Sequence, residues 1–470
     1  MPIEHVVPEI AVVVGAAIVL VTVLFAGRER QWLAAPLTLV TLGAAAIFTL
    51  DVAINGAPLV TMHGTWALDD VTNAARLTIL GATALVVLLS PEWFRSDPRH
   101  GEYYTVLLLS ALGAMLMAGA ADTMELVVGI LLASVTGYTL AAYHRGSGAS
   151  VEAGMKFFLV GGLANVVLLT GVVLLFGVTK ATGYTEIASA LSGDVSTPAL
   201  VAAVAMIAVG VAFELGAIPA HAWMPDVAEG APAPVAGFLT VVPKIGALVG
   251  LMRILSLVPE GEAGWRPLVA VLALLTMTLG NLAALWQTDV RRLLGWSSVS
   301  QSGYGLMAVV AIGRSDDAIP ALVAFLVAYA VANLAAFGVV VELRGRTAIE
   351  DYYGLAHERP WLAAAMAVAL LSLVGIPPLA GFVAKLELFT ATIDAGYGWL
   401  AVAAVVNTVV SLFYYLRVIG PAYLQPAPGR VPVLGRWAAS SVTVATVAVV
   451  ALGLGAALVL EPLTSAVLLP

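Results

Sequence analysis

The chain has 470 residues, of which 61% are hydrophobic and 11% charged, and its formal net charge is −8. An ordinary soluble domain carries about 25% charged residues, so this composition excludes a water-facing surface over most of the chain. The thinly spread charge excludes a basic surface for nucleic acid. The absence of cysteine excludes disulfides, thiolate metal sites and a cysteine nucleophile.

Fourteen apolar runs follow one another along the chain, and each is close to the roughly 20 residues that a membrane-spanning helix needs. The first run follows an acidic flank, Met1-Pro2-Ile3-Glu4-His5, which is unlike the positive start of a signal peptide, so we expect it to be retained. The runs lack the alternation of outer-membrane strands. We therefore predict an all-α polytopic membrane protein with spans near 8–27, 32–53, 71–91, 103–121, 123–143, 151–178, 197–219, 232–256, 267–286, 290–313, 318–342, 360–393, 397–421 and 435–460.

Basic residues in the connections between spans predict the orientation of the bundle. Thirteen lie in odd-numbered connections and four in even-numbered ones. Because Lys and Arg gather in cytoplasmic loops, we expect the odd connections in the cytoplasm and both termini on the non-cytoplasmic side of the inner (plasma) membrane. The odd connections and adjoining span ends hold Arg28, Arg30, Arg95, Arg99, Arg145, Arg291, Arg292, Arg344, Arg346, Arg359, Arg417, Arg430 and Arg436, and the even ones hold Lys180, Arg253, Arg266 and Arg314.

The other four basic residues lie within the predicted spans, where a buried charge is costly and usually functional. They are Arg76, Lys156, Lys244 and Lys385. Lys244 lies in the middle of its span beside Pro243, so its side chain cannot easily reach the membrane surface. We expect Arg76 to be a structural or interface charge, and a structural pairing is the alternative for Lys156, which lies near a helix start.

Two predicted spans carry a proline break beside ionisable residues. One break contains Pro219 between Glu214 and His221, and the other contains Pro377 and Pro378 before Lys385. Proline removes a backbone donor, and interrupted spans in corresponding places of two halves mark the ion site of many transporters. The alternative is that both breaks serve packing alone.

The breaks lie five spans apart, which predicts two inverted repeats. Residues 1–100 would form an N-terminal three-helix segment, 101–256 the first five-helix repeat and 257–425 the second. Residues 426–470 would form a last helix.

Several stretches of the sequence are specific enough to indicate a family. They are Gly101-Glu102-Tyr103-Tyr104, Ala141-Ala142-Tyr143, Glu152-Ala153-Gly154-Met155-Lys156-Phe157-Phe158, Pro219–Val227, Glu229–Val235, Pro243-Lys244, Gly280–Leu285, Arg292-Leu293-Leu294, Leu371–Pro377 and Tyr414-Tyr415-Leu416-Arg417. Together they make residues 101–417 resemble the antiporter-like subunits of complex I, the proton-pumping NADH–quinone oxidoreductase. The segment from Asp226 to Val235 favours subunit N over the L, M and cation-antiporter relatives.

The resemblance implies a proton-channel subunit with fourteen helices in two inverted five-helix repeats and no redox cofactor of its own. NADH, FMN, iron–sulfur clusters and quinone are then expected in partner subunits. The implied partners are the lipid bilayer, the antiporter-like subunit M and the small subunits A, J and K, with protons as the transported ion and no nucleic acid.

In this family a chain of ionisable residues crosses the middle of the membrane, and the present sequence matches it unevenly. The family lysines of helices 6, 8 and 12 correspond to Lys156, Lys244 and Lys385. The remaining positions depart from the family pattern: the glutamate of helix 5 is Leu131, the lysine of helix 7 is Glu214, and the frequent histidine of helix 10 is Gln301.

The two departures in helices 5 and 7 compensate each other, since an unpaired buried lysine opposite Leu131 would be costly. Glu214 then needs a new partner, and we predict an ion pair with Lys156 or Lys244. The predicted relay comprises Glu214, Lys244, Lys385, Lys156 and His221, although His221 can equally cap the broken helix. Gln301 cannot take up a proton and is a candidate for holding water.

Three functions remain open from the sequence. The first is proton translocation driven by quinone reduction elsewhere in an NADH–quinone oxidoreductase-type complex. The second is a subunit of a multi-subunit cation/proton antiporter. The third is a structural membrane subunit that has lost its gate for proton uptake, which the change to Leu131 keeps open.

Overall fold

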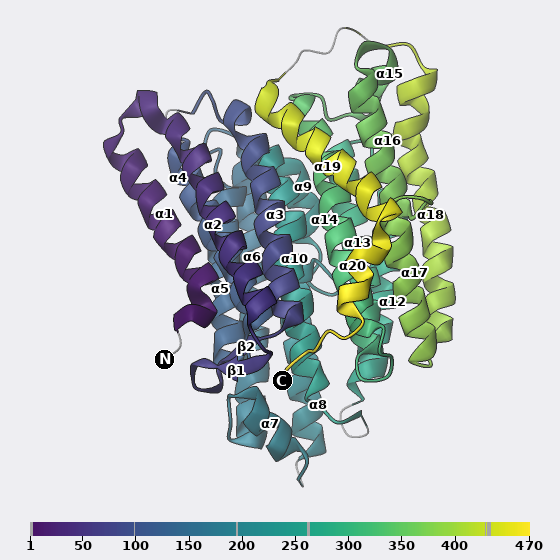
Figure 1. Cartoon of the computed structure of the whole chain (residues 1–470). Helices are drawn as coiled ribbons and strands as arrows, with labels where there is room; N and C mark the ends of the chain where they lie inside the picture. Colours follow the sequence, from purple (N-terminus) through teal and green to yellow (C-terminus); the bar gives the residue numbers. More distant parts are fainter. Residues whose placement is uncertain (1–2, 98, 194–195, 261–263, 428, 430–433) are drawn as a thin grey trace.

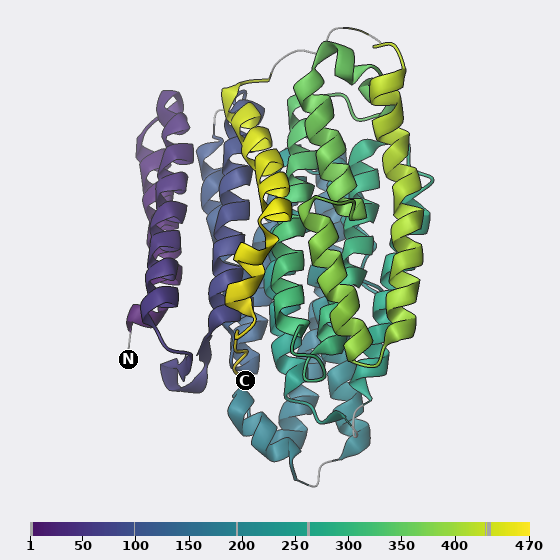
Figure 2. The same ribbon diagram turned by 45° about the vertical axis from the view of Figure 1, so that its right-hand side comes forward.

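The computed structural model describes residues 3–97, 99–193, 196–260, 264–427, 429 and 434–470, and the predictions made for Met1, Pro2 and Arg430 lie outside this range. The described chain is a bundle of helices with one hairpin, in which β1 (Leu59–Thr61) pairs antiparallel with β2 (Trp66–Leu68). The first described turn and the last residues lie at the same end of the bundle (Figures 1 and 2). This placement fits an even number of membrane crossings.

The helices run up and down through the bundle (Figure 1). In chain order they are α1 (Val7–Phe25), α2 (Ala34–Asn55), α3 (Asp70–Trp93), α4 (Gly101–Gly119), α5 (Thr123–Ala141), α6 (Gly148–Thr179), α7 (Tyr184–Leu191), α8 (Thr197–Leu215), α9 (Trp223–Gly230), α10 (Ala233–Ser256), α12 (Trp265–Ala284), α13 (Val290–Ala311), α14 (Ala318–Glu342), α15 (Leu355–Glu358), α16 (Pro360–Val374), α17 (Ala380–Asp394), α18 (Gly398–Leu424), α19 (Arg436–Leu454) and α20 (Ala456–Leu460). Short 3-10 turns are η1 (Ile3–Val6), η2 (Arg28–Leu33), η3 (Met62–Gly64), η4 (Ile349–Tyr352) and η5 (Glu461–Leu463).

Twelve of the described helices are long and apolar enough to cross a membrane, which confirms the prediction of an all-α polytopic membrane protein. Two predicted spans are not among them. Residues 290–313 form α13, which serine, glutamine and arginine side chains make less apolar, and residues 360–393 form two shorter helices, α16 and α17. The count of fourteen spans therefore stays a prediction.

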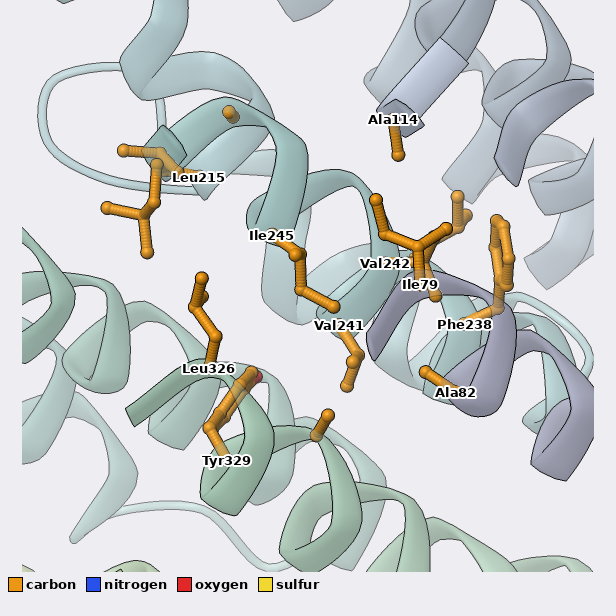
Figure 3. Close-up of a cluster of buried hydrophobic side chains, with 14 of the residues drawn as sticks. Ile79, Ala82, Ala114, Leu215, Phe238, Val241, Val242, Ile245, Leu326 and Tyr329 are labelled. Atoms are coloured by element: carbon orange, nitrogen blue, oxygen red, sulfur yellow. The ribbon is translucent and has the colours of Figure 1, made fainter. Parts of the chain in front are cut away.

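Helix α10 occupies the centre of the bundle. All its residues from Ala233 to Leu255 are buried, as expected for a helix that is apolar on every side, and it contacts α3, α4, α8, α13 and α14. Figure 3 shows side chains of α10 between those of α3 and α14. At Gly246 a Cβ atom would lie 2.2 Å from the carbonyl oxygen of Ala114, so the small residue allows α4 to approach. Lys244 therefore lies in the protein interior.

Both predicted helix breaks are present. Helix α8 ends at Leu215, the left-handed Gly216 follows with φ of 62°, and α9 begins after the cis peptide Ile218–Pro219. Helix α16 ends at Val374, Gly375 follows with φ of 98°, and α17 begins after the cis peptide Pro377–Pro378. Helices α8 and α16 enter the bundle from opposite ends (Figure 1). Their carboxyl ends therefore both point towards its middle.

Two buried ion pairs join the bundle to its flanking segments. Arg76 of α3 binds Glu9 of α1 with its Nε atom 2.8 Å from Oε1, which agrees with the structural role expected for this arginine. Arg253 of α10 binds Asp69, with Nη1 2.7 Å from Oδ2, and both side chains are fully buried. Arg253 also donates to the carbonyl of Leu469, so the C-terminal segment is attached to the end of the central helix.

Candidate functional site

Lys244 is held by two neighbouring helices through neutral groups. Its Nζ atom donates to the carbonyl of Ser298 on α13 at 2.7 Å and to the Ser298 hydroxyl at 2.9 Å. It also lies 3.4 Å from the Tyr329 hydroxyl of α14 and 4.7 Å from the centre of that ring. The side chain is fully buried. An amine in this position is solvated by protein oxygens and an aromatic ring in place of water.

The hydroxyl groups around Lys244 form a connected network that the sequence reasoning missed. Tyr329 donates to the carbonyl of Thr240 at 2.8 Å and shares a 2.7 Å hydrogen bond with Ser298. Asn333 donates to the Thr240 hydroxyl at 2.9 Å. The signal was available, because Thr240 precedes Lys244 by four residues and Tyr329 precedes Asn333 by four. This spacing puts each pair on one helix face.

Lys385 binds the free end of the broken helix α16. Its Nζ atom donates to the carbonyls of Leu373 at 2.9 Å and Val374 at 3.1 Å. The ammonium lies 4.0 Å from the centre of the Tyr304 ring on α13. A cation is favourable at the carboxyl end of a helix, and half-helix ends coordinate transported ions in other membrane proteins. Gln301 donates to the same Leu373 carbonyl at 3.0 Å.

The predicted ion pair of Glu214 is wrong. Its carboxylate is buried and accepts a 2.6 Å hydrogen bond from Ser134 of α5. Within the described residues it has no ion pair at 4.0 Å or less. Lys156 instead pairs with Glu152 at 2.7 Å and Asp226 at 3.1 Å, and 46% of its side chain is exposed.

The direction of the side chains on α6 explains why Lys156 does not pair with Glu214. Phe157 points into the bundle, where its ring stacks on Trp223 at 4.0 Å and lies 5.4 Å from the ring of Phe213. Trp223 also donates to the Phe213 carbonyl at 3.0 Å. Successive residues of a helix point about 100° apart, so burying Phe157 turns Lys156 outwards. Aromatic rings thus occupy the inner face of α6 beside Lys156.

His221 lies in the break between α8 and α9 and is partly buried. Its ring centre is 5.8 Å from that of Trp296 on α13. In the described part of the chain its Nδ1 atom is buried without a hydrogen-bond partner. The structure therefore does not connect His221 with Glu214 or Lys244. At Leu131, where the family has a glutamate, the side chain packs against the apolar core, and Ser134 is the nearby α5 residue that reaches Glu214.

Helix α13 connects these groups. The Ser302 hydroxyl donates to the carbonyl of Leu215, next to Glu214, at 2.5 Å and lies 3.1 Å from the carbonyl of Ser298. Ser298 binds Lys244, and Gln301 shares an acceptor with Lys385. The sequence pattern singles out Gln301 of α13 but neither of the two serines. Among the described residues, no three His, Cys, Asp or Glu side chains gather into a group that could hold a metal ion.

Comparisons with known proteins agree with the sequence resemblance. The family model described as NADH:quinone oxidoreductase/Mrp antiporter, TM, matches residues 120–411. NADH-quinone oxidoreductase subunit N of Mycobacterium sp. (strain JLS) is 45% identical, over 88% of this chain and 87% of that protein. Subunit N 1 of Streptomyces griseus is also 45% identical, over 97% of both chains.

Solved structures have the same fold. A chain of respiratory complex I from Thermus thermophilus matches with a TM-score of 0.83 and 30% identity, over 97% of this chain and 99% of that one. A chain of the Mrp complex from Dietzia sp. matches with a TM-score of 0.86, over 99% of this chain and 97% of that one. Its identity is 24%, so this second match bears on the fold alone.

Proposed function

Because the chain belongs to the NADH-quinone oxidoreductase subunit N family, we propose that it is a proton-translocating membrane subunit of an NADH–quinone oxidoreductase-type complex. Quinone reduction in partner subunits drives proton movement through this chain, which carries out no redox chemistry itself. Its neighbours in the membrane are an M-type antiporter-like subunit and small subunits of the A, J and K types. The connections rich in arginine face the cytoplasm of the plasma membrane.

The observation that carries the proposal is a set of three buried ionisable side chains whose contacts are neutral. Glu214 is bound by a serine, Lys244 by a serine and a tyrosine, and Lys385 by two carbonyl groups. Burying an unpaired charge costs several kcal/mol, so groups of this kind in a membrane mark proton or ion pathways. These three residues form the proposed relay.

Two further residues of the predicted relay have other surroundings. The ion pairs of Lys156 with Glu152 and Asp226 support its structural alternative. The partly buried ring of His221 lies against Trp296 in the break that follows Glu214. We place His221 at the edge of the relay, beside the break that follows Glu214.

Local features support the two inverted repeats, 101–256 and 257–425. Asp122 caps α5 and bridges to Gly183, and Asp289 caps α13 and bridges to Ala348. Each proposed repeat also contains a helix that ends at a left-handed glycine before a proline. Residues 1–100 and 426–470 flank the repeats.

The relay is tested by replacing Lys244 with methionine in the assembled complex and measuring protons translocated per electron. The control is Lys180→Met, which changes an exposed lysine in a connection. We expect the Lys244 variant to assemble and to lose translocation, while the control keeps it. Normal translocation by an assembled Lys244→Met complex would overturn the relay and favour a structural subunit.

An antiporter subunit is the second candidate, because the matching family model also covers Mrp antiporters. The same vesicles distinguish the two. A redox-driven proton pump translocates protons in sodium-free medium when quinone is reduced. An antiporter moves protons when a cation gradient is imposed without electron transfer. The 45% identity to subunit N over nearly the whole chain favours the pump.

A further inference from the structure

We propose that Gln301 and Ser302, neighbouring residues of α13, are positioning residues that attach the free carbonyl groups of both broken helices to one element. This inference rests on the proposed relay and deepens it. It assigns to α13 the task of keeping the ends of α8 and α16 in register with Lys244 and Lys385.

The ends of the two broken helices determine which carbonyl groups are free, because the last four carbonyls of a helix lack a helical donor. In an α-helix, the carbonyl of one residue accepts from the N–H four residues later. Leu215 lies four residues before Pro219, and Leu373 lies four residues before Pro377. The helices have ended before these prolines, and proline has no N–H, so neither carbonyl has a donor four residues later. Each buried acceptor must then find a replacement.

Adjacent side chains of α13 supply the two replacements. Ser302 donates to the Leu215 carbonyl at 2.5 Å, and Gln301 donates to the Leu373 carbonyl at 3.0 Å. Each donor thus meets one of the carbonyls left free at the end of a broken helix. A single helix therefore contacts the ends of two half-helices that reach the middle of the bundle from opposite sides (Figure 1).

Gln301 has an additional consequence for Lys385. The Leu373 carbonyl accepts from both side chains, with Lys385 Nζ at 2.9 Å. When the ammonium leaves this carbonyl to pass on a proton, the amide of Gln301 remains and the buried acceptor stays paired. Without Gln301, the same movement would leave the acceptor unsatisfied, which is unfavourable.

A small cavity lies beside the Lys385 side chain. Gln301, Tyr329, Leu373 and Lys385 are among its lining residues, and it offers about 10 Å³ to the centre of a water molecule. This is close to the volume of about 10–15 Å³ that one bound water needs. Tyr329, another lining residue, contacts Lys244. The cavity thus connects the surroundings of the two lysines beside Gln301.

The experiment compares three variants of α13 in the assembled complex. Gln301→Met keeps the length of the side chain and removes its donor, and Gln301→His restores an N–H donor. Ser300→Ala is the matched control, because the neighbouring Ser300 hydroxyl is buried without a hydrogen bond in the described structure. The readout is protons translocated per electron together with the rate of quinone reduction.

We expect Gln301→Met to lower proton translocation by about tenfold, the size of effect expected when one buried acceptor is left unpaired. Gln301→His should recover most of this loss, and Ser300→Ala should behave as the unmodified complex. Recovery by a donor distinguishes positioning from general packing. Equal activity of Gln301→Met and Ser300→Ala, or no recovery in Gln301→His, would overturn the inference.

Substitutions of Ser302 test the inference independently if the Gln301→Met complex fails to assemble. Ser302→Ala should lose translocation and Ser302→Thr, which keeps the hydroxyl, should retain it; equal behaviour of the two would overturn the inference. The Lys244→Met variant separates the two proposals. Loss of translocation in Lys244→Met with none in the α13 variants refutes the positioning role alone, whereas normal translocation in Lys244→Met refutes the relay itself.

Discussion

Replacing Asp69 by asparagine should leave the buried Arg253 without its counter-charge. The two side chains are fully buried and joined by contacts of 2.7 and 3.2 Å. Asparagine keeps one side-chain oxygen for the helix cap, in which Oδ1 accepts from the Thr72 amide at 2.8 Å. It replaces Oδ2, which accepts from Arg253 and from the Leu469 amide, by an NH2 donor, so both the charge and this acceptor are lost. Removing one partner of a buried ion pair costs about 3–5 kcal/mol. We expect about 3 kcal/mol, because Arg253 keeps its bond to the Thr72 hydroxyl.

Hydrogen exchange of the C-terminal segment measures this loss. The amide of Leu469 donates to Asp69 at 2.9 Å, and Arg253 donates to the Leu469 carbonyl. A loss of about 3 kcal/mol corresponds to an increase in local opening of about a hundredfold. The control is Asp51→Asn, because Asp51 is exposed and accepts from Asn55 on its own helix. Exchange at Leu469 that is the same in both variants would refute the reasoning.

Two further predictions concern the buried ion pairs. Burial alone would raise the pKa of Asp69. The charge and hydrogen bonds of Arg253 lower the pKa by more than burial raises it, so it lies below the ordinary value of 3.8. The pair therefore stabilises the fold at neutral pH, and this contribution is lost as the pH falls through the lower native pKa. The temperature at which the unmodified complex aggregates should therefore fall more steeply with decreasing pH than that of the Asp69→Asn complex. An equal fall in the two complexes would contradict this. Glu9→Gln should lower the free energy of unfolding by about 3–5 kcal/mol, because it leaves the buried Arg76 without its counter-charge. The double variant with Arg76→Met should recover part of this stability in thermal unfolding. A further loss in the double variant would argue against the pair.

The broken helices and the buried lysines could be predicted because both depend on local chemistry. Proline lacks an N–H wherever it lies, so Pro219 and Pro377 end their helices regardless of tertiary structure. Lys244 sits within a long apolar run, and length alone places it far from both membrane surfaces. Its burial in α10 follows from the sequence.

The partner of Glu214 could not be predicted, because it depends on which faces of three helices meet. Order along the chain made Lys156 a neighbour, yet the inward turn of Phe157 points Lys156 to the surface. The Ser134 hydroxyl that replaces it carries no charge and is one of many small polar residues in the spans. A serine of this kind becomes distinctive only when its distance from Glu214 is known.

The free carbonyl groups at the ends of the two broken helices are bound by different donors, and this difference distinguishes the two halves of the bundle. At the end of α16, Lys385 supplies an ammonium to the freed carbonyls. At the end of α8, Ser302 supplies a hydroxyl, and the carboxyl of Glu214 turns to Ser134. A carboxylate at the carboxyl end of a helix lacks the favourable interaction that a cation has there. Of the proposed relay residues that lie beside a helix break, the one in the first half, Glu214, therefore carries a carboxyl group and the one in the second half, Lys385, an amine. Helix α13 contacts both helix ends through Gln301 and Ser302. Its polar side chains make it less apolar than an ordinary membrane span, and they connect the surroundings of Glu214 directly with those of Lys385.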